Sequence, residues 1–269
     1  MKVKIASLIV YISLIFGVKA QGDLMIYPKR VVFETISESI DLTLANTGND
    51  SAQYQISFIN YRMAENGKFE KIYEPEEGQF FAENNLRVFP RTVTLAPRES
   101  QKVKVQVFRA NQLETGEYRS HLYFRAVPKE KPLEKQKSNE EVTGISTKLD
   151  MVFGISIPVI IEVGNPDVKS ALSHLALDRQ QRSTQFNFTI LREGNKSSYG
   201  DFKVLHTDQS GKETQVGTVK GVAVYAPIPH RHFSIKLKDE VDYSSGELKV
   251  VYHAQEGKKE TFAQASLQL

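Results

Sequence analysis

The sequence contains no cysteine and no tryptophan. Without cysteine, no disulfide can form in an oxidising compartment and no thiolate can bind a metal ion. The absence of tryptophan counts against an aromatic platform for stacking sugar rings. A strong excess of charge is also missing, because a net charge of +3 over 269 residues does not indicate nucleic-acid binding.

Catalytic motifs are missing as well. The sequence has neither a glycine-rich phosphate-binding loop nor a G-x-S-x-G nucleophile motif. No pair of acidic residues stands out for acid–base chemistry. We therefore expect a protein that is not an enzyme and needs no cofactor. The enzyme class that stays open is a carbohydrate-active sandwich, which requires two carboxylates about 5 to 10 Å apart.

Residues 1–20 have the features of a cleaved export signal. Lys2 and Lys4 precede an apolar run over residues 5–17, and small residues stand before the predicted cleavage point after Ala20. The run is shorter than the roughly 20 residues that span a bilayer. An uncleaved membrane anchor is the alternative. No later segment is apolar enough to span a membrane, so we expect an exported protein without stable membrane insertion.

The remaining chain shows the alternation of apolar and polar residues that is typical of half-buried strands. Residues that favour turns separate the alternating runs, and no stretch has a helical period over three turns. Many short strands with such spacing predict an all-β sandwich fold. The clearest runs are 40–44, 54–58, 103–107, 186–190, 233–237 and 248–252.

A break in this pattern at Gly164-Asn165-Pro166 predicts two domains. A long apolar strand precedes the break, and a new series of strands and turns follows it. Each part is long enough to form its own sandwich. We therefore predict an N-terminal domain over residues 21–163 and a C-terminal domain over residues 164–269.

The segment 128–148 is rich in lysine and glutamate and predicts a long, solvated loop. Such a loop is either functional or a tolerated insertion. Apolar residues then occupy every second position from Leu149 to Ile161. The start of this strand either faces its own core or adds to the sheet of a partner, since an exposed apolar edge is normally avoided.

Several segments resemble the strands of periplasmic pilus chaperones, the PapD-like proteins, in order and spacing over nearly the whole mature chain. The resemblance implies two immunoglobulin-like β-sandwich domains set at an angle. It also implies a periplasmic chaperone that caps the subunit of a surface fibre and delivers it to an outer-membrane usher. The segments that carry the resemblance are 27–34, 40–46, 89–97, 101–107, 116–125, 222–227 and 246–252.

In this family the strand after the long loop is lent to the incomplete fold of the subunit. The resemblance therefore assigns the donor strand to alternate residues after the loop, whose large apolar side chains would fill the missing place in the subunit. An unloaded strand of this kind also predicts self-association of the free protein. The donor-strand residues are Thr147, Leu149, Met151, Phe153 and Ile155.

The family also anchors the C-terminal carboxylate of the subunit with a pair of basic residues. Arg30 matches the first of them, and an arginine can bond both oxygens of a carboxylate. The second position falls on Ser156, and an arginine that joins the two domains in the family is replaced by Ile160. We expect a divergent member with Arg30 as its candidate anchor.

Two interpretations compete with a chaperone that releases its partner. One is a structural or adhesive sandwich that never releases a partner, and the other is the carbohydrate-active enzyme. A metal site is not expected, although His230 and His232 lie on one face of a predicted strand. No acidic residue stands nearby in the sequence to complete a site, so we interpret both as surface histidines.

Overall fold

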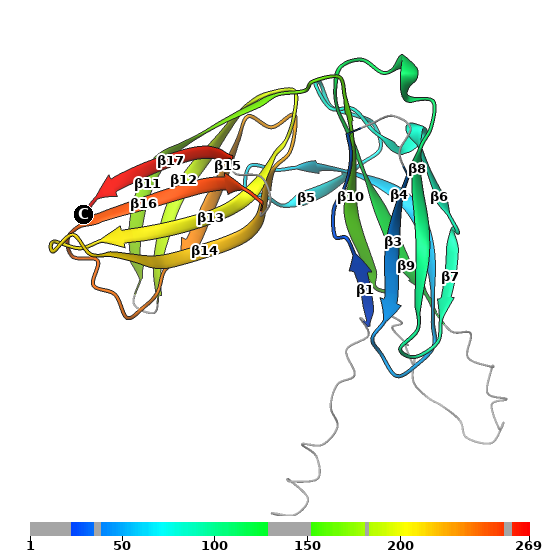
Figure 1. Ribbon diagram of the computed structural model, residues 1–269, viewed down its shortest axis with the longest axis horizontal. Helices are drawn as coiled ribbons and strands as arrows, with labels where there is room; N and C mark the ends of the chain where they lie inside the picture. Colours follow the sequence, from blue (N-terminus) through cyan, green and yellow to red (C-terminus); the bar gives the residue numbers. More distant parts are fainter. Residues whose placement is uncertain (1–22, 35–38, 129–151, 181–182, 256–259) are drawn as a thin grey trace, which may run out of the picture.

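The computed structural model describes residues 23–34, 39–128, 152–180, 183–255 and 260–269. These residues form seventeen strands and two short 3₁₀ turns, and none of them belongs to an α-helix. Figure 1 shows two elongated lobes that meet at a bend. The predicted all-β fold, with two immunoglobulin-like sandwiches set at an angle, is confirmed.

The first lobe consists of strands β1 to β10 in two facing sheets. One sheet has the order β1-β3-β8-β6, and the other has the order β2-β10-β9-β4-β5 with β7 also pairing with β4. This arrangement is that of an immunoglobulin-like sandwich. The strands are β1 (Leu24–Tyr27), β2 (Val31–Phe33), β3 (Ser39–Asn46), β4 (Ala52–Met63), β5 (Phe69–Ile72), β6 (Leu86–Phe89), β7 (Thr92–Leu95), β8 (Ser100–Val107), β9 (Gly116–Val127) and β10 (Gly154–Val163).

The second lobe consists of the last seven strands, also in two sheets. One has the order β11-β12-β15 and the other the order β14-β13-β16-β17. All pairs within these sheets are antiparallel. The strands are β11 (Val168–Gln180), β12 (Ser183–Gly194), β13 (Ser198–Thr207), β14 (Glu213–Val224), β15 (His230–Lys236), β16 (Glu247–Ala254) and β17 (Thr261–Gln268).

Alternation explains why these segments form strands. In β8 the side chains of Val103, Val105 and Val107 are buried, whereas the polar residues between them are exposed. Side chains of a strand point alternately to opposite faces, so this pattern places one face on the core and one in water. The first core lies between the two sheets of the first lobe and a separate core lies between those of the second.

Two prolines divide segments that the sequence presents as continuous. The segment 27–34 resembles one strand, but the structure places β1 and β2 in different sheets, with Pro28 between them. Pro90 separates β6 from β7 in the same way, because β6 pairs with β8 and β7 pairs with β4. A proline has no N–H to donate to a ladder, so the chain leaves one sheet and joins the other at these points.

The two lobes are joined by a short connection between β10 and β11. β10 ends at Val163 and β11 begins at Val168. We propose the domain boundary at residue 164, as the sequence predicts. The strands on either side of this connection belong to different sandwiches and contribute to different cores.

Candidate functional site

The first half of β10 carries large apolar side chains at the surface. Phe153 and Ile155 are 46% and 37% exposed, whereas Ile157 and Val159, the next members of the same alternation, are buried. All four point to the same side of the sheet. The core of the sandwich therefore covers only the second half of the strand, and Phe153 does not belong to the buried core of its own domain.

Three of the five predicted donor-strand residues lie before this point. Thr147, Leu149 and Met151 are outside the described residues. Phe153 and Ile155 are described, and both extend the ladder with β9: the carbonyl of Phe153 accepts from the amide of Ala126 at 3.0 Å, and Ile155 lies opposite Phe124. The start of β10 is thus a strand held by a neighbour on one edge.

The other edge of β10 is open at its start. β2 pairs in parallel with Val159–Ile161 only, and within the described residues no strand pairs with the outer edge of residues 153–157. Because Ala126 donates to Phe153, antiparallel alternation points the N–H groups of Gly154 and Ser156 away from β9. Two backbone donors and their carbonyls are therefore available to an added strand.

Two residues shape this open edge. Gly154 lies under the ring of Tyr123, where a Cβ atom would come within 2.4 Å of the ring and its hydroxyl. Any larger residue there would displace the tyrosine. Pro158 is the next residue after Gly154 and Ser156 whose backbone faces the open edge, and a proline has no N–H to donate. The open edge is consequently short, and it ends where the pairing with β2 begins.

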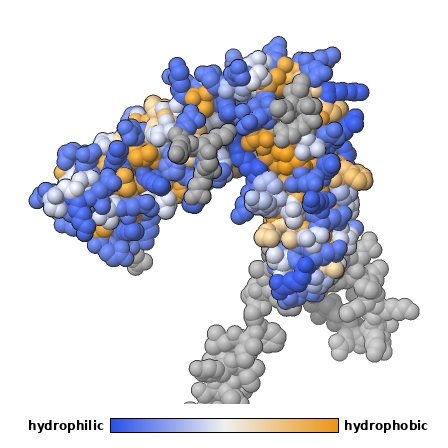
Figure 2. All heavy atoms as spheres, in the orientation of Figure 1, coloured by the Kyte–Doolittle hydropathy of each residue, from blue (hydrophilic) through white to orange (hydrophobic). Residues whose placement is uncertain are grey.

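The surface beside the bend is also apolar. In the view of Figure 2 an apolar area lies on the first lobe next to the junction with the second lobe, with polar residues along part of its edge. Large exposed apolar patches rimmed by polar residues mark sites of protein interaction.

Arg30 lies just before β2 and reaches the second lobe. Its Nη1 donates to the hydroxyl of Tyr225 at 3.0 Å. Its guanidinium carbon lies 4.3 Å from the centre of the Tyr199 ring and 5.5 Å from that of the Tyr225 ring. The side chain is only partly buried. Arg30 is therefore in the region between the lobes, with guanidinium N–H groups left over for a ligand.

A second arginine in this region was missed by the sequence reasoning. Arg119 of β9 is 4% exposed and its guanidinium stacks 4.2 Å from the centre of the Tyr225 ring. Its Nη2 donates over long distances, 3.3 and 3.4 Å, to the carbonyls of Tyr61 and Ala226. Within the described residues, its Nε and Nη1 have no hydrogen-bond partner.

Burial dominates the electrostatics of Arg119. It lowers the pKa of the Arg119 guanidinium, and the positive charge of Arg30 acts in the same direction, whereas Tyr225 and Glu117 act against it. Two unpartnered guanidinium nitrogens in a buried position are costly to keep. Buried charged groups without full hydrogen bonding occur both in ligand-binding sites and in structural networks. The two arginines face Tyr225 together, which gives the region a paired positive charge.

His121 lies two residues further along the same face of β9. It is 3% exposed and packs edge-on against the rings of Tyr61 at 5.0 Å and Phe69 at 5.5 Å. Burial lowers the pKa of His121 to about 3, and the charges of Arg119 and Arg30 contribute to the decrease. His121 is therefore neutral under ordinary conditions and forms part of the packing between the lobes.

Apolar packing holds the junction at its centre. Ile160 is fully buried in a small cluster with Met63, Ala223 and Tyr225. Ile160 is the direct cross-strand neighbour of Arg119. Residues of β4 and β10 thus pack against the end of β14.

Polar contacts fix the junction on the other side. The buried carboxylate of Glu117 accepts hydrogen bonds from the backbone amide of Ser197, at 2.8 Å, and from the Ser197 hydroxyl. Nearby, Lys196 forms an ion pair of 2.6 Å with Glu162, and both side chains are largely buried. The Glu117 carboxylate is a specific, satisfied contact between the first lobe and the start of β13.

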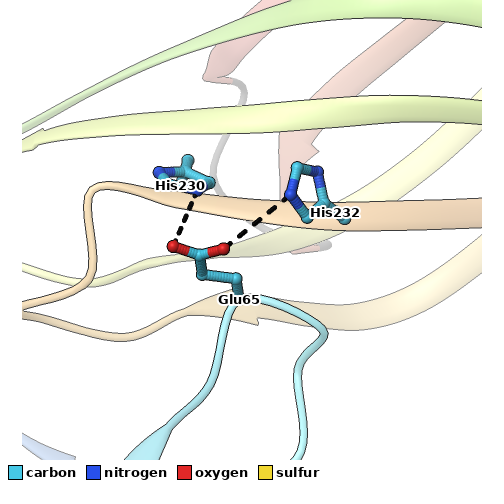
Figure 3. A group of neighbouring side chains, drawn as sticks. All are labelled: Glu65, His230 and His232. Atoms are coloured by element: carbon cyan, nitrogen blue, oxygen red, sulfur yellow. Dashed lines mark ion pairs between the residues drawn. The ribbon is translucent and has the colours of Figure 1, made fainter.

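The structure brings an acidic side chain, which the sequence did not indicate, to the two histidines of β15. His230 and His232 do lie on one face, but Glu65, from the turn between β4 and β5, lies against both (Figure 3). Its Oε1 is 3.0 Å from His230 Nε2, and its Oε2 is 3.9 Å from His232 Nε2. An acidic partner is therefore present, and it comes from the other lobe.

No helix in the described part of the chain is long and apolar enough to cross a membrane. This finding concerns helices in the described ranges alone. The predicted export signal, residues 1–20, lies outside the described residues, so its cleavage stays a prediction.

Comparisons with known proteins give structural similarity only. No protein-family model matches the sequence, and no curated protein matches it significantly. The chain is similar to the YadV chaperone at 14% identity, with a TM-score of 0.46 over 92% of this chain and 100% of that one. It is also similar to the class 5 fimbriae chaperone CfaA, at 16% identity and a TM-score of 0.42, covering 91% and 98%. A third similarity, at 13% identity and a TM-score of 0.43 over 92% and 98%, is to a chain of the CsuC–CsuE chaperone–tip adhesion subunit pre-assembly complex from Acinetobacter baumannii.

Proposed function

We propose that this protein is a periplasmic chaperone that caps a fibre subunit by lending it the start of β10 as a strand, and then delivers it to an outer-membrane usher. The observation that carries the proposal is the open edge at residues 153–157, where Phe153 and Ile155 are exposed and no described strand pairs on the outer side. The resemblance of the strand segments to PapD-like chaperones supports it.

Strand addition fits the chemistry of this edge. An extended partner strand would accept from and donate to the outward backbone groups of Gly154 and Ser156, which gives affinity with little sequence selectivity. Phe153 and Ile155 would enter the partner's core, and each large apolar side chain buried in this way contributes about 1.5–3 kcal/mol. Thr147, Leu149 and Met151 continue the alternation and are proposed to extend the donor strand.

Such an edge is costly for a free protein. Exposed apolar edge strands are sites of aggregation and are usually shielded. We expect the unloaded protein to associate with itself at high concentration through this edge. No nucleotide is required for the cycle, because folding of the subunit around a replacement strand supplies the free energy of release.

The proposed function is tested by co-purification from the periplasm of the native host. A tag at the C-terminus, Leu269, is far from β10 in sequence and lies at the free end of the second lobe (Figure 1). We expect a small, secreted, β-rich polypeptide to be recovered in a one-to-one complex that dissociates when the usher is supplied. A complex that forms but is never released to an usher would favour the adhesive sandwich.

We further propose that Arg30, which is partly exposed, binds the C-terminal carboxylate of the subunit, and that the buried Arg119 adds its positive charge from behind Tyr225. Changing Arg30 to Gln should weaken binding of a subunit with a free C-terminus by about 10- to 100-fold, since hydrogen bonds to charged groups contribute about 1.5–3 kcal/mol. Binding is measured by calorimetry with the purified subunit. A neighbouring exposed cation changed in the same way, Lys29→Gln, is the matched control and should have no effect.

A subunit with an amidated C-terminus separates this role from simple packing. It should bind the wild type and the Arg30→Gln variant equally weakly, because the amide removes the charge that the arginines recognise. If the Arg30→Gln variant instead loses affinity for both forms of the subunit by the same factor, Arg30 only holds the two lobes together through Tyr199 and Tyr225.

A further inference from the structure

We propose that Glu65, His230 and His232 bind one transition-metal ion, with Zn²⁺ as the best fit, across the junction of the two lobes (Figure 3). The proposal does not depend on the function proposed above. Two imidazoles and one carboxylate are a common set of three protein ligands for zinc, and they leave a fourth position for water. The exposure of His232 and Glu65, 62% and 57% for their side chains, gives an ion and a water access to the cluster.

The geometry is close to what a bound ion needs. Potential ligand atoms of the three residues all lie within 4.8 Å of one another. Tetrahedral coordination with bonds of about 2.0–2.1 Å separates ligand atoms by about 3.3 Å. The distance from His230 Nε2 to Glu65 Oε1 is 3.0 Å and that from His232 Nε2 to the other oxygen, Oε2, is 3.9 Å, so each histidine already lies near this separation from one carboxylate oxygen. Small side-chain rotations therefore suffice to surround an ion.

Thr189 prepares one histidine for this role. Its Oγ1 lies 3.1 Å from Nδ1 of His232. When the Nδ1–H of His232 donates to this hydroxyl, the lone pair of the ring is on Nε2, the atom that faces Glu65. Metal-binding histidines are typically oriented by a second hydrogen bond of this kind from the other ring nitrogen. Thr189 on the neighbouring strand β12 therefore offers an acceptor for the tautomer of His232 that a metal requires.

The turn that carries Glu65 is fixed against β15 independently of the side chains of the cluster. The backbone amide of His232 donates to the carbonyl of Glu65 at 2.8 Å. Gly67 (φ +80°) lies so close to Arg231 that a Cβ atom would come within 2.4 Å of its guanidinium. Arg231 is held in turn by a hydrogen bond of 2.6 Å to the carbonyl of Ala223. The three ligands are therefore positioned before an ion arrives.

The ligand types select among metals. Imidazole nitrogen favours zinc and its transition-metal neighbours, whereas Mg²⁺ and Ca²⁺ favour sites made only of oxygen. Without a metal, the same atoms form exposed imidazole–carboxylate pairs, which contribute little to stability. A bound ion would instead link the β4–β5 turn of the first lobe to β15 of the second, and so oppose movement at the bend.

The test is a calorimetric titration of the untagged full chain with zinc chloride, after treatment with a chelator, because a histidine tag would bind the metal itself. We expect one equivalent of Zn²⁺ to bind, with no competition from an excess of MgCl₂ or CaCl₂. Zinc should also raise the melting temperature, since a ligand that binds only the folded state stabilises it. No saturable binding, or binding that Mg²⁺ displaces, would overturn the proposal.

Variants separate this cluster from adventitious binding. Glu65→Gln and His232→Ala should each lower the affinity for Zn²⁺ by at least about 10-fold, and Thr189→Val, which keeps all three ligands, by about 10-fold. His174→Ala is the matched control, because His174 lines the same surface recess and is not part of the cluster. Equal affinity in all four variants and the wild type would overturn the proposal, and melting without zinc shows which variants are folded.

Discussion

Changing Phe153 to Glu should reduce the affinity for the fibre subunit by more than about 100-fold while leaving the free protein folded. Phe153 is 46% exposed and lies before the covered half of β10, so a charge there remains in water in the free protein. In the complex the same position enters the partner's core. The variant then loses the burial of a phenylalanine, about 1.5–3 kcal/mol, and has to bury an unpaired carboxylate.

The chain offers a closely matched control for this substitution. Phe89, at the end of β6, is 78% exposed and belongs to the other sheet of the same lobe. Phe89→Glu introduces the same chemical change away from the open edge and should leave subunit binding unchanged. Both variants should melt within a few degrees of the wild type. Equal losses of binding in the two variants, or unfolding of Phe153→Glu, would show that β10 has no special role.

The second large effect expected is a loss of stability in acid that depends on His121. Its pKa is about 3 in the folded protein because of burial and the charges of Arg119 and Arg30, whereas an unfolded histidine titrates near 6.5. Between these two values only the unfolded state takes up a proton. The titration of His121 therefore leaves the free energy of unfolding unchanged above about pH 6.5. As the pH falls below this value, the free energy of unfolding decreases by up to about 1.4 kcal/mol for each pH unit, down to about pH 3.

Replacing His121 with Phe should remove this decrease in the free energy of unfolding at acidic pH. The imidazole packs against the rings of Tyr61, Phe69 and Tyr225, and its Nδ1 has no hydrogen-bond partner within the described residues. An aromatic ring without ionisation suits such a position. Urea unfolding of both proteins between pH 7 and pH 4 measures the difference.

The difference between the two proteins is informative because other acid-sensitive groups are common to both. Hydrogen bonds lower the pKa values of Asp208 and Asp242, so both favour the folded state more strongly at higher pH, in the wild type and in the variant alike. The stability of the wild type should therefore fall more steeply with acidity than that of His121→Phe. Parallel curves would mean that His121 is protonated in the folded protein or hydrated at the junction.

Local patterns in the sequence were sufficient for most of the fold. Strands such as β8 alternate because one face packs on a core and the other meets water, and this contrast is visible in the residues themselves. The interruptions at Pro28 and Pro90 were not predicted as changes of sheet. They depend on which strand offers a partner on the far side of the proline, and that is a property of the assembled sandwich.

The junction between the lobes was the part that the sequence could not reveal. Arg119 and His121 occupy the face of β9 that would meet water in an isolated sandwich, and they are buried because the second lobe and the β4–β5 hairpin cover them. A charged residue in an alternating strand does not indicate that another part of the protein will bury it. The acidic partner of His230 and His232 was missed for the same reason, since Glu65 reaches them only through the packing of one lobe on the other.

The exposed start of β10 could be predicted in part. The alternation from Leu149 onward indicated a strand that is too long and too apolar for its place after a charged loop. The sequence alone left open whether its side chains face the protein's own core. The answer depends on how far the opposite sheet extends along β10. In the structure the opposite sheet does not cover Phe153 and Ile155, and both side chains are exposed.

Amide hydrogen exchange at Gly154 and Ser156 tests the central claim most directly. In the free protein both N–H groups point away from β9 and should exchange rapidly, whereas the N–H groups of Ile155 and Ile157 point toward β9 and should be protected. Addition of the fibre subunit should slow exchange at Gly154 and Ser156 strongly, because a strand added at this edge would bond both groups. A complex in which these two amides still exchange at the rates of the free protein would contradict strand donation by β10.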